Sequence, residues 1–351
     1  MLFRSAVSFS PQFTPGASLE ALRAHWIKAC IDFDEPIADQ TLNLAFSMFP
    51  VESVCIEVLQ KGISEIGGLW YENRASVQQE HFASALAMRR IDTLLSASPA
   101  PTRSQTVIVG CAPKEWHAFT PLLISLFLRR RGLNVIYLGA NVPAPLFQEM
   151  VTKVRANLVV LVAQQLVTAA TLLQTSQVLG IQGTRIAFGG RIFNSQPLLI
   201  RRITGSFLGE TVDEAIGNIE MLATGSIKNP NAESIAQEYV TAALTFQMQR
   251  PHIEATLKQA VWSFSHGAET MKIATEFLGD NIVAALQLGD VSLIDNEIDW
   301  VSTLLKANHI PDGALSEFMQ HYAEAVNTNI NGSGKPIYDW LSAQVQKFKS
   351  Q

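Results

Sequence analysis

The chain has 351 residues, of which 48% are hydrophobic and 16% charged, and its formal net charge is −5. The hydrophobic fraction excludes wholesale disorder, and the acidic balance argues against a protein that binds nucleic acid over its whole surface. No apolar run reaches the roughly 18 residues that a membrane span needs, so no membrane partner is expected. Three cysteines without metal-like spacing, and no signal-peptide pattern, predict reduced thiols and a cytoplasmic protein.

The first part of the chain is predicted to be helical. Residues 1–17 contain Ser, Pro and Gly without periodicity and are predicted to be a flexible lead-in. Beyond them, apolar residues such as Leu19, Leu22 and Trp26 recur at helical spacing, and no strand-like alternation interrupts the pattern. Residues 18–98 are therefore predicted to form a bundle of about four helices.

The pattern changes in residues 105–226, where short and almost wholly apolar runs alternate with helix-length segments. These runs are residues 106–112, 134–140, 158–163, 185–190 and 206–210. Such runs are typical of parallel strands covered by helices on both faces, so we predict a doubly wound, parallel five-stranded Rossmann-like domain. Ligands of this architecture bind beyond the carboxyl ends of the strands, here in the loops at 113–120, 164–168 and 189–194.

Residues 231–351 return to a helical pattern and are predicted to form a third, all-helical domain. Breaks in this pattern are expected at Arg250–Pro251, Leu288–Asp290, His309–Gly313 and Asn331–Pro336. The predicted fold class is thus multidomain, α and α/β, with about three domains. The charged fraction is low against a typical value of about 25%, which allows apolar pockets or subunit interfaces.

One chemical motif follows the first predicted strand, where Glu115 stands two residues before His117. A carboxylate in this position can accept the proton of one imidazole nitrogen and leave the other to bind a metal ion. The pattern E-x-H is common, however, and on these residues alone an ordinary loop histidine remains the alternative.

The surrounding segment resembles the cobalamin-binding fold of methionine synthase, mutases and light sensors. The resemblance rests on E-x-H, on the phrase YLGANVP at 137–143, and on Gly189 and Gly190 after the fourth predicted strand. It implies that His117 is the lower axial ligand of cobalt, assisted by Glu115. It also implies that the two glycines let the backbone approach the buried nucleotide tail of the cofactor.

The segment departs from the family pattern at three positions. Glu115 replaces an aspartate, Thr120 replaces a glycine, and Val162 stands where a serine is usual. Gln164 and Gln165 are then expected to offer amide hydrogen bonds to the tail. Because glutamate is longer than aspartate, the resemblance implies a weaker or longer bond between His117 and cobalt. An α/β domain that has lost its cofactor is the alternative.

A second motif lies in the helical part, where Trp70, Glu80, His81 and Ser84 form W-x9-E-H with a serine three residues later. Taken singly, Trp70 is more typical of a core or interface aromatic, and His81 of an ordinary helix histidine. The spacing resembles CarH-type photoreceptors, which use adenosylcobalamin. The resemblance implies that the bundle caps the upper corrin face, with Trp70 over the adenosyl group and Glu80 contacting it. His81 would then be a metal ligand once light has broken the Co–C bond.

The C-terminal helices resemble the globin-like domain of photocobilins, which bind a bilin (biliverdin) beside cobalamin. A bilin pocket needs aromatic and aliphatic walls with a few polar groups. The candidate residues are Trp262, Phe264, His266, Trp300, His321, Tyr322 and Arg250. Each alone is more typical of a core or surface position. No cysteine follows Cys111, so a bilin would be held non-covalently or by a cysteine of another domain.

Together the resemblances imply a light-sensing photoreceptor that binds adenosylcobalamin, with a bilin as a second chromophore, rather than an enzyme. The alternatives are a corrinoid carrier of a methyltransferase system and an interaction scaffold without cofactor. Related repressors carry a winged helix that this sequence lacks, so DNA is not expected as a partner. A homo-oligomer such as a dimer, with an unknown downstream partner, is expected.

Overall fold

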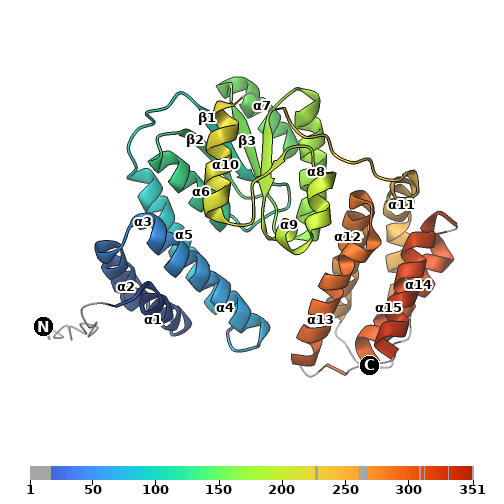
Figure 1. Ribbon diagram of the computed structural model, residues 1–351. Coiled ribbons are helices and arrows are strands. Elements are labelled where there is room, and N and C mark those ends of the chain that lie inside the picture. Colours follow the sequence, from blue (N-terminus) through green and yellow to red (C-terminus); the bar gives the residue numbers. More distant parts are fainter. Residues whose placement is uncertain are drawn as a thin grey trace, which may run out of the picture. The chain divides into compact units, whose positions relative to one another are not determined.

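The computed structural model describes residues 17–225, 228–260, 262, 268–307, 310–311, 313–330 and 332–349. Nearly all of the predicted lead-in, and the bilin candidates Phe264 and His266, lie outside the described residues. The chain divides into two compact units, Met1–Ala97 and Ser98–Gln351, which Figure 1 colours from blue to red along the sequence.

The first unit is helical wherever it carries regular structure, as predicted for this stretch. Its elements are α1 (Leu19–Ile31), α2 (Glu35–Met48), α3 (Val51–Val54), the π-helical η1 (Cys55–Gln60), α4 (Lys61–Tyr71) and α5 (Val77–Ser96). Ser18 caps the first helix and Ser76 caps the last, each accepting a backbone N–H of the first turn. Trp26 is fully buried, and a Cβ on Gly62 would lie 2.8 Å from its ring. The indole of α1 therefore packs directly on the α4 backbone.

The second unit begins with a five-stranded parallel sheet in the order β2-β1-β3-β4-β5. Its strands are β1 (Thr106–Cys111), β2 (Asn134–Gly139), β3 (Leu158–Val162), β4 (Ile186–Gly189) and β5 (Ser206–Phe207). Every residue of β1 and β3 is buried, as expected for strands covered on both faces. Each strand lies inside one of the predicted apolar runs, and the prediction of a doubly wound sheet is confirmed.

Helices alternate with the strands along the chain. They are α6 (Phe119–Arg130), α7 (Ala144–Val154), α8 (Leu166–Ile181), α9 (Arg191–Ser195), the 3-10 helix η2 (Pro197–Arg202) and α10 (Val212–Thr224). Helix α6 contacts α10, and α7 contacts α8. The turns that join strands to α6, α8 and α9 lie at the carboxyl edge of the sheet, where ligands of this architecture bind.

The C-terminal part of this unit contains further helices. They are α11 (Gln237–Gln259), α12 (Ala268–Leu288), η3 (Val291–Ile294), α13 (Asp295–Ala307), α14 (Gly313–Asn329), η4 (Gly332–Gly334) and α15 (Lys335–Lys349). The predicted break after Leu288 is confirmed, but the break at Arg250–Pro251 is wrong, because α11 continues through Pro251. Pro251 removes the hydrogen bond to the carbonyl of Gln247, and both residues are exposed, so water can replace it.

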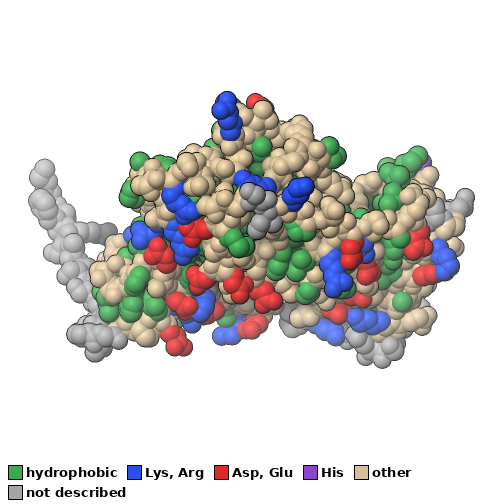
Figure 2. Space-filling view, turned by 45° about the horizontal axis from the view of Figure 1, so that its top comes forward, with side chains coloured by type: hydrophobic (Ala, Val, Ile, Leu, Met, Phe, Trp, Pro, Cys, Tyr) green, Lys and Arg blue, Asp and Glu red, His purple; other side chains and the backbone are tan. Residues whose placement is uncertain are grey.

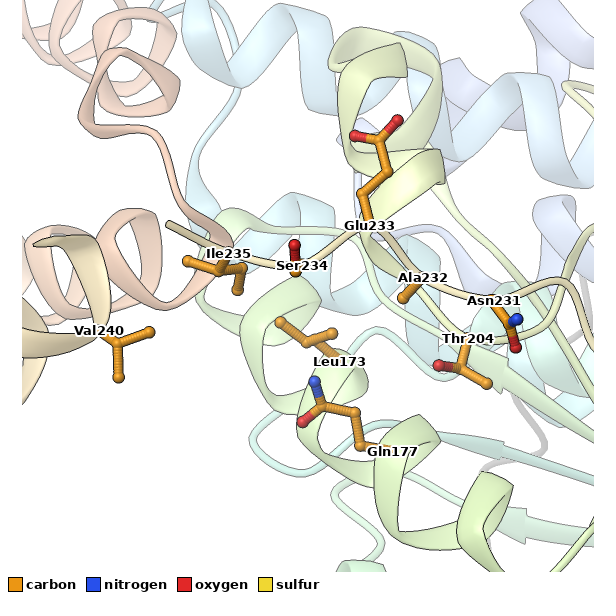
Figure 3. A pocket seen from close by; sticks show the side chains of 9 residues that line it. All are labelled: Leu173, Gln177, Thr204, Asn231, Ala232, Glu233, Ser234, Ile235 and Val240. Carbon is orange, nitrogen blue, oxygen red and sulfur yellow. The ribbon is translucent and has the colours of Figure 1, made fainter. Parts of the chain in front are cut away.

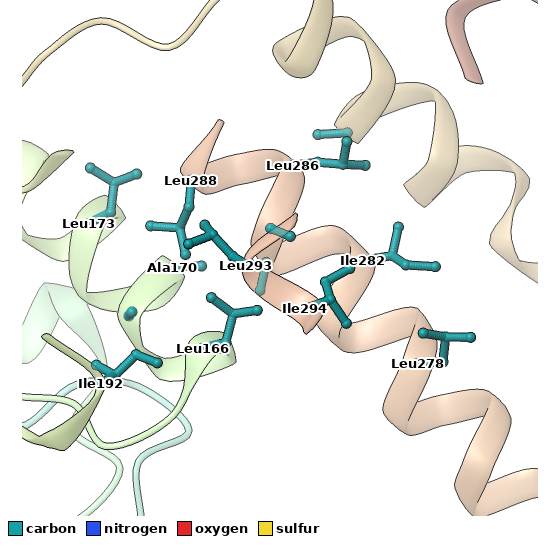
Figure 4. Close-up of a cluster of buried hydrophobic side chains, with 14 of the residues drawn as sticks. Leu166, Ala170, Leu173, Ile192, Leu278, Ile282, Leu286, Leu288, Leu293 and Ile294 are labelled. Atoms are coloured by element: carbon teal, nitrogen blue, oxygen red, sulfur yellow. The ribbon is translucent and has the colours of Figure 1, made fainter. Parts of the chain in front are cut away.

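The α/β part and the C-terminal helices share one hydrophobic core. Helix α8 packs against α12, and the side chains between them form a continuous cluster (Figure 4). Labelled members are Leu166, Ala170, Leu173, Ile192, Leu278, Ile282, Leu286, Leu288, Leu293 and Ile294. The separate domain predicted from residue 231 onward is thus closely packed on the sheet domain. None of the described helices combines the length and apolarity that crossing a bilayer requires.

Candidate functional site

The centre of the candidate site is the carboxylate of Glu115, which is completely buried just beyond β1. Its Oε1 accepts hydrogen bonds from the backbone N–H of His117 at 2.9 Å and pairs with Nδ1 of the same ring at 2.6 Å. Its Oε2 accepts from the backbone N–H of Gln164 at 2.6 Å and from Oγ1 of Thr168 at 2.7 Å. A buried carboxylate is tolerated when all its lone pairs are used in this way.

These contacts determine the direction in which the pKa of Glu115 is shifted. Burial by itself raises the pKa of Glu115, but the side-chain and backbone hydrogen bonds from His117, followed by those from Thr168 and Gln164, outweigh it. The pKa therefore lies below its ordinary value and the carboxylate is ionised at neutral pH. An ionised Glu115 requires the proton on Nδ1 of His117, so the ring would coordinate a metal through Nε2. The His117 side chain is 61% exposed, whereas that of Glu115 is 0% exposed.

One segment, at the junction of β3 and α8, supplies the remaining donors. Gln164 lies in the turn between β3 and α8, and Thr168 lies in the first turn of α8, where its hydroxyl also accepts the backbone N–H of the N-cap residue Gln165. Thr168 lies in the predicted ligand loop at 164–168 but was not predicted as a site residue. It is 1% exposed, and a buried hydroxyl at the start of a helix beside the predicted ligand loop was the available signal.

Gln164 contributes through different atoms than the sequence suggested. Its side-chain Oε1 accepts the backbone N–H of Arg191 at 2.9 Å, and its own backbone N–H holds Glu115. Gln165 serves as the N-cap of α8. In the structure these amides therefore tie loops together, and their predicted hydrogen bonds to a nucleotide tail stay a prediction.

Backbone packing at the ends of β3 and β4 explains one glycine of the pair Gly189 and Gly190. Gly190 has φ 128°, and a Cβ there would lie 1.9 Å from the carbonyl oxygen of Ala163. Only glycine fits this position, because the backbone after β4 lies against the end of β3. At Gly189 an added Cβ would meet Leu208 at 3.7 Å, an ordinary contact. Thr120 is half-buried in the first turn of α6, at the same edge of the sheet as Glu115.

The second predicted cluster lies at the start of α5 in the helical unit. Glu80 pairs with Nδ1 of His81 at 2.6 Å through Oε2 and accepts the hydroxyl of Ser84 at 2.8 Å through Oε1. The Glu80 side chain is 27% exposed and that of His81 is 75% exposed. The structure thus brings these three predicted residues together on one solvent-facing turn.

Trp70 lies at the C-terminal end of α4, six residues before Ser76, the N-cap of α5. It is half-buried, and its ring centre lies 4.9 Å from that of the exposed Tyr71. Trp70 is therefore not a fully enclosed core residue of this unit.

Among the bilin candidates, Trp262 and His321 come together. Their ring centres are 4.7 Å apart in a T-shaped arrangement, and Trp262 also stacks on Phe318 at 6.2 Å. His321 lies between Glu317 and Glu324, at 3.7 and 3.6 Å. Tyr322 is fully buried, with a hydroxyl that has no hydrogen-bond partner among the described residues. Its ring packs on Phe318.

Trp300 lies in the wall of an apolar cavity of about 280 Å³ between α12, α13 and α14, which Phe318 also lines. Arg250 is the candidate for a propionate partner, but its guanidinium already pairs with Glu254 at 2.8 Å and Asp280 at 2.6 Å. A bilin carboxylate would have to compete with these two ion pairs.

Other surface features lie away from the Glu115 loop. A hollow of about 530 Å³ is bordered by Gln177, Thr204 and the segment 231–235 (Figure 3). Because Thr204 precedes β5, this hollow lies toward the end of the sheet where strands begin. On the face in Figure 2, Lys and Arg side chains are interspersed with Asp and Glu. Arg103 and Arg131 both form ion pairs with Glu220. The described residues contain no group of three or more His, Cys, Asp or Glu suited to hold a metal ion by themselves.

Comparison with known proteins supports a cobalamin-related chain. The family described as "B12 binding domain" matches residues 22–95, which include Trp70, Glu80, His81 and Ser84. The chain is 30% identical over 125 residues to the HTH-type transcriptional repressor CarH of Myxococcus xanthus, covering 36% of this chain and 42% of the relative. It is 32% identical over 123 residues to the repressor CarA of the same organism, covering 35% and 41%. The matched part thus spans about two fifths of the length of these curated relatives.

Among solved structures, the chain is similar to the monomethylamine corrinoid protein of Methanosarcina barkeri, with 16% identity and a TM-score of 0.47. That match covers 57% of this chain and 95% of the other. The chain therefore combines a helical segment similar to the B12 binding domain with a five-stranded parallel α/β domain, and part of it is similar in sequence to the CarH and CarA repressors.

Proposed function

We propose that this chain is a light-sensing protein that binds adenosylcobalamin. The observation that carries the proposal is the Glu115 network, in which one buried carboxylate fixes the His117 ring at the ligand-binding edge of a doubly wound sheet. The B12-binding match on residues 22–95 and the likeness to CarH support it independently.

The residues present fit such a cofactor. An exposed imidazole whose Nδ1 is held by a buried carboxylate is a suitable donor for cobalt through Nε2. Glu115 keeps the ring in one tautomer and one orientation, and Gln164 and Thr168 keep Glu115 in place. The loops at Gly189 and Thr120 border the same edge of the sheet. These residues would form the lower side of the site.

The helical unit would act on the upper side. Adenosylcobalamin supplies a cobalt–carbon bond that visible light breaks. We assign to Trp70 the exclusion of water from the adenosyl group, and to Glu80 and Ser84 the orientation of His81. His81 would be the residue that can bind cobalt after illumination, since its ring is exposed and its Nδ1 pairs with the carboxylate of Glu80. The resulting change in the helical unit would be the signal.

A bilin in the C-terminal helices is the second part of the proposal. The aromatic group of Trp262, His321 and Phe318 supports it, together with the apolar cavity at Trp300. Protein produced with biliverdin should then show a red absorption band that the H321A variant loses. A cytoplasmic homodimer without DNA or membrane partners stays a prediction.

The decisive experiment is reconstitution with adenosylcobalamin in the dark followed by green light. We expect a spectral change in the wild type, a different photoproduct spectrum in H81A, and greatly reduced binding in H117A. A bound cofactor with a spectrum that green light leaves unchanged would refute light sensing. If the W70A variant bound methylcobalamin and transferred its methyl group as the wild type does, the corrinoid-carrier alternative would be favoured.

A further inference from the structure

The helix that carries Trp70 is not a regular α-helix along its whole length. Between α3 and α4 (Figure 1), the residues Cys55–Gln60 of η1 form a π-helical segment. Such segments are rare, are stabilised by bonds between residues five apart, and occur frequently at functional sites. A π turn accommodates one additional residue. Without it, α4 would be rotated by roughly 100° relative to α3, because an α-helix has 3.6 residues per turn.

One carbonyl of the π segment receives a hydrogen bond from another helix. The backbone N–H of Lys61 donates to the carbonyls of Ile56 and Val58, and so bypasses the carbonyl of Glu57, which an α-helix would use. Nη1 of Arg23, on α1, donates to this carbonyl at 2.9 Å. A part-buried carbonyl without a donor is unfavourable, so the bond from Arg23 stabilises the π turn relative to a regular α-helix.

The same guanidinium also contacts α4. Nε of Arg23 pairs with the carboxylate of Glu65 at 2.6 Å, and the Arg23 side chain is 16% exposed. Arg23 therefore binds one group in the π segment and another group in the helix that follows it. A rotation of α4 by one residue would carry Glu65 away from the guanidinium while the carbonyl of Glu57 stayed in place. Both bonds can thus form together only in the π register.

Packing at Gly62 requires the same register. A Cβ at Gly62 would lie 2.8 Å from the ring of Trp26 on α1, closer than side chains approach. Rotation by one residue would bring Lys61 or Ile63 opposite the indole, where even a Cβ does not fit. The helix α4 would then have to move away from α1. The register of α4 and its packing on α1 are therefore determined together.

This register also determines the position of Trp70, which lies on the same helix eight residues after Gly62. We propose that Arg23 is a positioning residue for Trp70, because it holds η1 in the π register and so directs the indole toward the adenosyl group. The inference rests on the proposed function, which assigns Trp70 to that group, and it adds a residue outside both sequence motifs. Loss of Arg23 should reduce the preference for a cobalamin that carries an adenosyl group.

The first test measures this preference as the ratio of the dissociation constants of hydroxocobalamin and adenosylcobalamin, with the full chain in the dark. R23M should lower the ratio about fivefold, since an aromatic contact contributes about 1 kcal/mol, and should change the hydroxocobalamin constant less than about twofold. R23K keeps the charge but not the planar fork of donors, and should give a smaller loss with less risk of unfolding.

The matched control is R90M. Arg90 is similarly enclosed, with a side chain that is 22% exposed, and it joins α5 to α2 through Asp39 and Asn43. It contacts neither η1 nor α4 in the described hydrogen bonds and ion pairs. R90M should therefore leave the preference unchanged. An equal loss in R90M and R23M would overturn the inference, because general loosening of the helical unit would explain both.

A rescue experiment separates the register from stability. Deletion of Glu57 removes the bypassed carbonyl and makes the bond from Lys61 to Ile56 an ordinary α-helical bond, while the later residues of α4 keep their face. The π turn and its need for Arg23 disappear together. R23M with Glu57 deleted should therefore recover the preference to within about twofold of the wild type, although each change removes contacts.

A measurement without cofactor follows the indole itself. In protein labelled with 5-fluorotryptophan, the fluorine NMR resonance of Trp70, assigned by its absence in W70F, should shift in R23M and return in the rescued variant. An unshifted resonance or an unchanged preference in R23M, or a double variant that behaves like R23M, would overturn the inference and leave the proposed function standing. A wild type that does not bind adenosylcobalamin refutes the proposed function, and the fluorine spectra then decide whether Arg23 sets the position of Trp70.

Discussion

Two glutamate–histidine pairs, Glu115–His117 and Glu80–His81, share the same carboxylate–imidazole distance but have opposite surroundings. In both, a carboxylate oxygen lies 2.6 Å from Nδ1 of the imidazole. Glu115 is completely buried and receives hydrogen bonds from two further residues of another loop. Glu80 is partly exposed and receives only one further side-chain bond in the described contacts, from Ser84 on its own helix.

This difference separates a permanent ligand from an exchangeable one. The carboxylate of Glu115 is fixed by contacts with residues distant in sequence. Folding therefore orients the His117 ring before any metal binds. The Glu80 pair is local to one helical turn and its orientation costs little to change. The comparison therefore predicts large effects at the first pair and small effects at the second in the dark.

Removal of the ligand itself should have the largest effect. H117A should weaken hydroxocobalamin by more than about 100-fold, because the lower cobalt ligand is lost. H81A should change the same dissociation constant by less than about threefold, since its proposed role begins after illumination. Spectroscopic titration in the dark measures both. Equal losses in the two variants would remove the distinction between the pairs.

Substitution of the carboxylates that orient the two histidines should give the next largest difference between the pairs. E115Q should weaken hydroxocobalamin about 10- to 100-fold and lower the free energy of unfolding by about 2 kcal/mol, because one amide oxygen cannot replace four accepted bonds. E80Q should change the unfolding free energy by less than about 0.5 kcal/mol. Urea unfolding of both variants, without cofactor, gives the stability difference. A destabilised E80Q would show that the second pair is also structural.

A smaller effect is expected at Thr168, which supports Glu115 from α8. T168V should lower the free energy of unfolding by about 1 kcal/mol and weaken hydroxocobalamin several-fold, because Glu115 loses a buried donor. T175V is the matched control, since Thr175 is equally buried and its hydroxyl, in the described part of the chain, donates to a carbonyl of its own helix. If T175V loses as much cobalamin affinity as T168V, the bond to Glu115 has no special role.

The smallest effect is expected at Glu297, whose pKa is shifted in the direction opposite to that of Glu115. Burial raises the pKa of Glu297 on α13 above the ordinary 4.5, although Arg191 partly offsets it. The folded state therefore binds this proton more tightly, and the stability gained from it is full below pH 4.5 and lost as pH rises through the folded pKa. E297Q should raise Tm by about 2 °C at pH 7.5 and leave it unchanged at pH 4. Thermal scans at the two pH values decide the point.

Much of the fold was predictable because local patterns carry it. The strands β1 and β3 are continuous apolar runs, and such runs are stable only when both faces are covered. Pro251 shows the limit of local reasoning, because proline alone predicts a break that the exposed position does not require. The E-x-H pair was visible in the sequence, but the complete burial of Glu115 was not.

The sequence by itself determined the alternation of strands and helices, and with it the edge of the sheet at which His117 lies, since periodicity and strand direction are local properties. Only the tertiary structure decided which donors surround Glu115. Thr168 is separated from it by 53 residues and meets it because β1 and β3 are neighbours in the sheet. The packing of α8 on α12, which joins the C-terminal helices to this loop, was likewise decided by contacts between distant apolar faces, which no local pattern specifies.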